Sequence, residues 1–171
     1  MIPVSDFLES FRLAGKLADI DVMFASFVGR QTNGSPSLTL LAALVSNAAS
    51  MRGEIALPVE SVWTKAALRD HLKALSGGGD AVAVLPGQPG GPDAPDADGF
   101  VDSLDWPPSP AAFPHIFREI RAEDAGSGAS GTGNAEPDIF AEAASVAPLV
   151  LSNGLLYLGR MYRNEELLRE Q

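Results

Sequence analysis

One stretch of the chain, between residues 38 and 48, is apolar on almost every side of the helix that its composition favours. Leucine and alanine dominate this stretch, and both are good helix formers. A helix that is apolar all round is a buried helix, so the rest of the fold must be built around it. Ser37 is a suitable N-cap for this helix, and Gly53 is a suitable residue to end it. The apolar positions are Leu38, Leu40, Leu41, Leu44, Val45 and Ala48.

Shorter periodic segments are available to surround this central helix. Apolar residues at three- and four-residue spacing predict one helix from Asp6 to about Gly15, and a second from Asp19 or Asp21 to about Gly29. Alternating residues from Ile55 to Val59 predict a brief strand, which Pro58 places at an edge or ends. Another helix is predicted from Thr64 to Leu75.

Two stretches rich in Gly, Pro, Ala and Asp interrupt these patterns. We interpret residues 76–110 as a surface insertion with a short strand at residues 81–85, and residues 125–136 as a flexible linker. Trp106 is expected to pack on the core. Ser109-Pro110 is typical of a helix start. The helix predicted there presents Phe113, Ile116, Phe117 and Ile120 on one side.

The clearest turn signal lies near the C-terminus. Apolar runs on both sides of Asn153-Gly154 predict a β-hairpin over residues 148–158, because both turn residues accept a positive φ. Residues 160–171 are helical in pattern and end at Gln171 without a capping signal, which we interpret as a truncation. The sequence therefore predicts a mainly helical α+β fold. It is a single domain over residues 1–171, a small helical domain with a C-terminal β-hairpin and a short extra strand.

Composition narrows the classes of function. The chain has 22 acidic and 12 basic residues, so its net charge of -10 repels a phosphate backbone. It has no cysteine, which excludes disulfides and Cys-ligated zinc and favours a reducing compartment. Neither a signal peptide nor a long apolar span is present. We expect a cytoplasmic protein with no membrane contact that does not bind DNA well by itself.

Motifs for enzymatic chemistry are weak. No Gly-rich phosphate loop followed by Lys and Ser or Thr occurs, so nucleotide hydrolysis by this chain is not expected. Asp96, Asp98 and Asp105 fall on a calcium-loop frame, but Ala94 stands where the first ligand is needed. His71 and His115 each lie alone on a predicted apolar face, which is typical of a core or rim imidazole.

Two other functions stay open at this point. One is a small stand-alone hydrolase or metal-dependent enzyme that uses Asp96, Asp98 and Asp105 or the histidines. The other is binding of single-stranded nucleic acid through Trp106, Tyr157 and Tyr162, which the charge balance disfavours.

Three segments, in this order, resemble the N-terminal region of RecD helicase subunits. The first is Ile20-Asp21-Val22-Met23-Phe24-Ala25. The second is Leu41-Ala42-Ala43-Leu44-Val45-Ser46, followed by Gly53-Glu54-Ile55-Ala56-Leu57-Pro58-Val59. The third is Pro148 to Leu151, the Asn153-Gly154 turn, and the run from Leu156 to Glu165, which is close to a Leu-Tyr-Leu-x-Arg-x-[Trp/Tyr]-x-x-Glu signature. The residues that carry the resemblance, in structural or partner-docking roles, are Asp21, Phe24, Gly53, Leu57, Asn153, Gly154, Tyr157, Arg160, Asn164 and Glu165.

The resemblance implies a role in the RecBCD exodeoxyribonuclease V complex. In this family the N-terminal domain docks RecD onto RecC, and a 5′-to-3′ DNA helicase motor that uses ATP and Mg²⁺ follows it. The resemblance thus implies a non-catalytic interaction domain, without cofactor or metal of its own, that meets DNA only through the absent motor in double-strand break repair and recombination. A docking face left uncovered predicts weak self-association.

Overall fold

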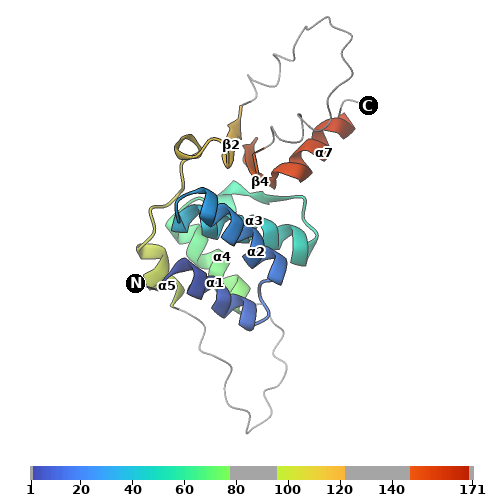
Figure 1. The fold of residues 1–171 in the computed structure, drawn as a ribbon. Coiled ribbons are helices and arrows are strands. Elements are labelled where there is room, and N and C mark those ends of the chain that lie inside the picture. The colour runs from blue at the N-terminus through green and yellow to red at the C-terminus, as the bar shows by residue number, and fades with distance from the viewer. Residues whose placement is uncertain (1, 78–95, 122–146, 170–171) are drawn as a thin grey trace, which may run out of the picture.

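The computed structural model describes residues 2–77, 96–121 and 147–169 (Figure 1). Five of the described helices form the body of the molecule, and a small sheet with the sixth lies at one end of it. The mainly helical α+β class, with a C-terminal hairpin and a short extra strand, is confirmed. The helices are α1 Val4–Leu13, α2 Asp19–Gln31, α3 Pro36–Arg52, α4 Lys65–Gly77, α5 Ala97–Asp102 and α7 Gly159–Arg169, with 3-10 turns at Val59–Ser61 and Pro110–Ala112. The strands are β1 Ala56–Pro58, β2 Phe117–Ile120, β3 Leu149–Ser152 and β4 Leu155–Leu158.

Helix α3 is the centre of the fold, as its composition predicts. Every residue from Ser37 to Ala48 is buried. The N-cap is Ser35, not Ser37, because Pro36 takes the first helical position and the Ser35 hydroxyl accepts a hydrogen bond from the amide of Leu38. Gly53 ends the helix with φ +66°, a left-handed conformation that glycine adopts without strain.

Helix α2 packs closely on α3 because the contact is made of small residues. A Cβ atom added to Gly29 would lie 2.8 Å from Oγ1 of Thr39. Ala25 and Val28 of α2 are fully buried against the same neighbour. The two helix backbones can therefore approach at a distance that larger side chains would prevent.

The sheet has the strand order β1-β4-β3-β2. Strands β3 and β4 form the predicted hairpin, with Asn153 at φ 50° and Gly154 at φ 74° in the turn. Strand β1 pairs antiparallel with β4, and β2 pairs parallel with β3. A strand near residue 57 and a hairpin near residue 153 are thus joined in one sheet.

The helix predicted after Ser109-Pro110 is wrong. This segment forms a 3-10 turn and then β2, in which Phe117 lies opposite Leu149. Ile116 and Phe117 are buried, and the carbonyl of Ile116 accepts a hydrogen bond from the amide of Leu149. The apolar side chains of this segment have three- and four-residue spacing, which is also the spacing of a buried helix face. The strand that pairs with the segment is distant in sequence, so the local pattern did not reveal it.

Part of the stretch predicted as a surface insertion forms a helix. Residues 97–102 form α5, and the Phe100 ring stacks on Phe7 of α1 with ring centroids 3.9 Å apart. Trp106 packs on the core as predicted, and its indole nitrogen donates to the carbonyl of Val62 at 2.8 Å. The predicted strand at residues 81–85 and the predicted linker at 125–136 lie outside the described residues.

Candidate functional site: a cavity between two distant segments

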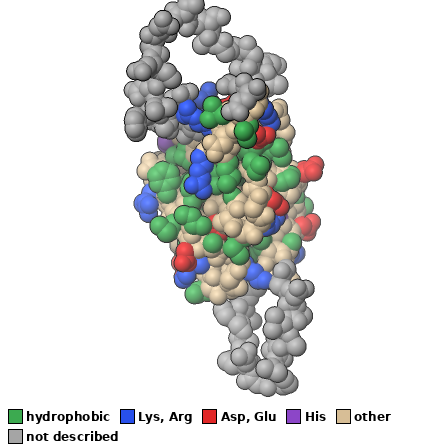
Figure 2. Space-filling view, turned by 90° about the vertical axis from the view of Figure 1, so that its right-hand side faces the viewer, with side chains coloured by type: hydrophobic (Ala, Val, Ile, Leu, Met, Phe, Trp, Pro, Cys, Tyr) green, Lys and Arg blue, Asp and Glu red, His purple; other side chains and the backbone are tan. Residues whose placement is uncertain are grey.

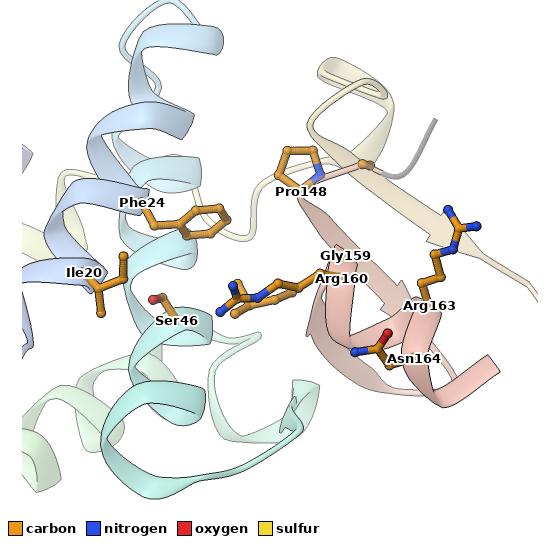
Figure 3. A pocket seen from close by; sticks show the side chains of 10 residues that line it. Ile20, Phe24, Ser46, Pro148, Gly159, Arg160, Arg163 and Asn164 are labelled. Carbon is orange, nitrogen blue, oxygen red and sulfur yellow. The ribbon is translucent and has the colours of Figure 1, made fainter. Parts of the chain in front are cut away.

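Helices α2 and α3 face the hairpin and α7 across a cavity of about 530 Å³ (Figure 3). Ile20 and Phe24 project from α2, while Arg160 reaches toward them from the first turn of α7. Segments separated by more than a hundred positions in the sequence therefore share one site. The described residues that line the cavity are Ile20, Phe24, Ser46, Ala147, Pro148, Leu158, Gly159, Arg160, Arg163 and Asn164.

Asp21 lies behind this cavity and is completely buried. One carboxylate oxygen accepts hydrogen bonds from the hydroxyls of Ser46 and Ser50, both at 2.7 Å. The other oxygen accepts from the backbone amide of Ala18 at 2.9 Å and from the side chain of Asn47 at 3.3 Å. Asp21 thus caps the start of α2 and fastens it to α3, which is a structural role.

Helix α2 carries a row of large apolar side chains that are wholly or partly exposed, although Phe24 also packs against the edge of the core. Ile20 is 55% exposed, Met23 67% and Phe27 40%. The rings of Phe24 and Phe27 stack with centroids 6.4 Å apart. We call Ile20, Met23, Phe24 and Phe27 the α2 stripe. Figure 2 shows a face of the molecule on which hydrophobic side chains gather across the middle, with a Lys or Arg group among them.

The hairpin residues of the resemblance divide into turn and core positions. Asn153 and Gly154 make the tight turn, and Leu57 of β1 is buried opposite Leu156 of β4. Tyr157 is buried, and its ring meets Tyr162 edge to face at 5.3 Å. These positions therefore support the sheet and do not line the cavity.

Glu165 links this core to α7. Burial, and then the neighbouring Glu165 carboxylate, raise the pKa of Tyr157 above its ordinary value. Of the last signature run, the structure brings Leu158, Gly159, Arg160, Arg163 and Asn164 to the cavity.

Two acidic residues of the calcium-loop frame have structural partners through their carboxylates, and Asp105 accepts a hydrogen bond from Ser37 through its backbone carbonyl. Asp96 caps α5 by accepting from the amide of Gly99, and Asp98 pairs with Lys73 at 3.1 Å. Asp102, outside the frame, pairs with Arg69 of α4. In the described residues no three His, Asp or Glu side chains come together as metal ligands. The structure therefore gives the metal-enzyme alternative no support.

The two histidines lie in different surroundings. His71 of α4 is half-buried, and its Nε2 atom has no hydrogen-bond partner in the described part of the chain. Burial, and then the charge of Arg52, lower the pKa of His71 to about 4. His115 is exposed in the turn before β2, because the helix predicted there does not form.

Residues 13–89 match the family model described as RecBCD enzyme subunit RecD, N-terminal domain. This part of the chain is similar to the N-terminal domain of RecD subunits. No curated protein and no solved structure matched the chain. The match covers the last residue of α1 and then α2, α3, β1 and α4, so it includes Asp21, Phe24, Gly53 and Leu57.

The RecD match ends before the hairpin, whose resemblance rests on its own signature residues. In the structure the matched part supplies one wall of the cavity, and the hairpin with α7 supplies the other. None of the described helices is both long and apolar enough to cross a membrane.

Sequence reasoning on this domain missed the partners of Asp21. Ser46, Asn47 and Ser50 are polar residues in the second half of a largely apolar helix, and their three- and four-residue spacing places them on one side. Polar residues on one side of a buried helix predict a buried polar partner, so the sequence did contain a signal for the partners of Asp21. Nothing in the sequence pattern indicated that Met23 is exposed.

Proposed function

We propose that this chain is the non-catalytic docking domain of a RecD-type helicase subunit, which joins the motor to RecC in a RecBCD-type exodeoxyribonuclease V. On this proposal it acts in double-strand break repair and recombination. ATP and Mg²⁺ belong to the motor, and this domain holds no cofactor or metal. The observation that carries the proposal is the exposed α2 stripe within the matched residues 13–89.

The α2 stripe has the pattern of a helix that binds another protein. Ile20, Met23 and Phe27 follow each other at three- and four-residue spacing, which places them on one side of the helix. The opposite side of α2, with Ala25 and Val28, is already used against α3. Apolar side chains in a contiguous exposed row are typical of a protein-binding surface, since water is a poor solvent for them.

The charge of the chain supports a protein partner over DNA. A net charge of -10 disfavours binding to a phosphate backbone. Binding of a protein through an apolar helix face does not depend on this charge. Large apolar residues such as Phe and Met are also enriched in protein interfaces.

The test is binding of the whole chain to a purified RecC subunit, followed by calorimetry. We expect a complex, and we expect Met23→Asp to weaken it roughly tenfold or more, because each 1.4 kcal/mol of binding free energy is worth a factor of ten. Met51→Asp is the matched control, since Met51 is also more than half exposed, at 53%, but lies outside the α2 stripe. Absence of any complex with the unchanged chain refutes the proposal.

The same preparations test self-association. If the α2 stripe is left uncovered in the isolated chain, sedimentation velocity should detect weak, concentration-dependent dimers. Met23→Asp should abolish these dimers and Met51→Asp should not.

A further inference from the structure

The cavity between α2, α3 and α7 has an apolar floor and a positively charged wall. Ile20, Phe24 and Leu158 contribute apolar surface, and Arg160 and Arg163 contribute the charge. No carboxylate is among the described residues that line it. In a chain with a net charge of -10, a cavity whose described lining holds no acidic residue is a local exception.

Arg160 is the residue that defines this exception. It is exposed, and it forms no ion pair with any residue in the described part of the chain. Its side chain runs from α7 toward Ile20, Phe24 and Ser46 (Figure 3). An arginine beside apolar side chains has a stem that packs and a guanidinium that still needs an acceptor.

The buried carboxylate of Asp21 is not available to Arg160. Asp21 lies behind Ser46, and both of its oxygens already accept hydrogen bonds from α2 and α3. Asp21 is therefore no partner for Arg160, and the exposed guanidinium is accessible to a carboxylate from another molecule. Arg160 also lies in the first turn of α7, where the amide end of a helix adds positive potential.

We propose that this cavity is the specificity pocket of the docking surface, and that it receives a partner segment in which an apolar side chain is followed closely by Asp or Glu. The apolar side chain packs against Ile20, Phe24 and Leu158, and the carboxylate pairs with Arg160 in a bidentate ion pair. The inference rests on the proposed docking function, because it specifies what the partner presents next to the α2 stripe. Charge complementarity selects the acidic partner, and the apolar lining selects the residue beside it.

The first test is a charge reversal measured by calorimetry with the whole chain and the RecC subunit. We expect Arg160→Glu to weaken binding roughly tenfold to a hundredfold, Arg160→Gln to weaken it less, and Arg160→Lys to keep part of it. Arg160→Gln should also reduce the dependence of affinity on salt. Arg118→Glu is the matched control, since Arg118 is exposed on β2 and does not line the cavity.

The outcomes separate this inference from the proposed function. If the unchanged chain binds RecC and Arg160→Glu binds as tightly as Arg118→Glu, the pocket inference is refuted and the docking function stands. If the unchanged chain does not bind RecC, both are refuted. Circular dichroism checks that each variant is folded, and Arg160→Gln keeps the test valid if the charge reversal disturbs α7.

The second test needs no disruption of the pocket. The chain has no cysteine, so a single introduced thiol reports on one position. Asn164→Cys, at an exposed position on the cavity wall, should react with maleimide in the free chain and be protected by RecC. Glu60→Cys, exposed in the turn after β1, should react at the same rate in both states. Equal reactivity of Asn164→Cys with and without RecC contradicts the inference, as does protection by a second copy of the chain alone.

Discussion

The hydroxyl of Ser46 in α3 donates a 2.7 Å hydrogen bond to the buried carboxylate of Asp21 in α2. Ser50 donates to the same oxygen, and Asn47 and the amide of Ala18 donate to the other. All donors in this group are uncharged, so the carboxylate is stabilised by dipoles and not by a cation. The arrangement fixes the position of α2, and with it the direction of the α2 stripe.

Removal of this carboxylate should destabilise the fold. We expect Asp21→Ala to lower the free energy of unfolding by roughly 2–4 kcal/mol, because four donors, two of them on the buried residues Ser46 and Asn47, lose an acceptor. Urea denaturation followed by far-UV circular dichroism measures this change. Asp19→Ala is the control, since Asp19 is exposed and its ion pair with Arg12 lies on the surface, so little change in stability is expected. Equal losses in the two variants would contradict the role of Asp21.

The close contact of α2 and α3 predicts a steric coupling between Gly29 and Thr39. Gly29→Ala should lower the free energy of unfolding by about 1–3 kcal/mol, because the new methyl group meets Oγ1 of Thr39 at 2.8 Å. Thr39→Ala alone loses the hydrogen bond to the carbonyl of Ser35, worth about 1 kcal/mol. The double variant should be less destabilised than the sum by at least ~0.5 kcal/mol, as a double-mutant cycle in urea would measure. Strict additivity would show that the contact is not tight.

His71 predicts a defined pH dependence of stability. Its pKa is lowered from 6.5 to about 4 in the folded chain, by burial first and by Arg52 second. Between these two values the unfolded chain takes up a proton that the folded chain does not, so this group reduces stability as the pH falls through that window. Above the window both states are neutral at His71, and it contributes nothing. Below the window both states are protonated at His71, and the destabilisation by this group has reached its full value.

The measurement for His71 compares variants at several pH values. Urea unfolding of His71→Gln should show a smaller loss of stability between pH 6.5 and 4 than the unchanged chain. His115→Gln, at an exposed position, should keep the slope of the unchanged chain. An unchanged slope in His71→Gln would contradict the assignment.

The turn between β3 and β4 predicts an asymmetry between two glycines. Gly154 has φ +74°, so Gly154→Ala should cost roughly 1–2 kcal/mol of stability because the added Cβ strains a left-handed conformation. Gly77 ends α4 in open space without a positive φ, so Gly77→Ala should be neutral or stabilising by up to about 1 kcal/mol. Thermal unfolding distinguishes the two. A neutral Gly154→Ala would mean that the turn relaxes to another type.

Local patterns predicted the elements that depend on local interactions. The buried α3 follows from composition alone, and the hairpin follows from Asn153-Gly154 and its apolar flanks. The strand β2 could not be predicted in this way, since the main-chain partners of Phe117 to Ile120 lie in β3, beyond residue 148. A short apolar segment acquires its conformation from the strand beside it.

The direction of α2 was the second property that periodicity could not supply. The sequence places Ile20, Phe24 and Phe27 on one side of this helix, and an apolar side is normally the buried one. In the structure the buried side contains Asp21, Ala25 and Val28, because small residues and a polar network allow the closer approach to α3. The cavity combines this unexpected exposure with a hairpin distant in sequence, so only its separate halves could be predicted.

The pairing of β1 with β4 makes the segment that matches the family model depend on the C-terminal hairpin for its folding. Leu57 lies opposite Leu156, so the only strand of the matched region that the structure describes has its hydrogen-bonding neighbour far beyond residue 89. A protein shortened at residue 89 would keep the whole segment that matches the family model, but β1 would lose the strand with which it pairs. The region that matches the family model therefore ends before the region that folds together. A transfer of this domain into another protein would have to include the hairpin.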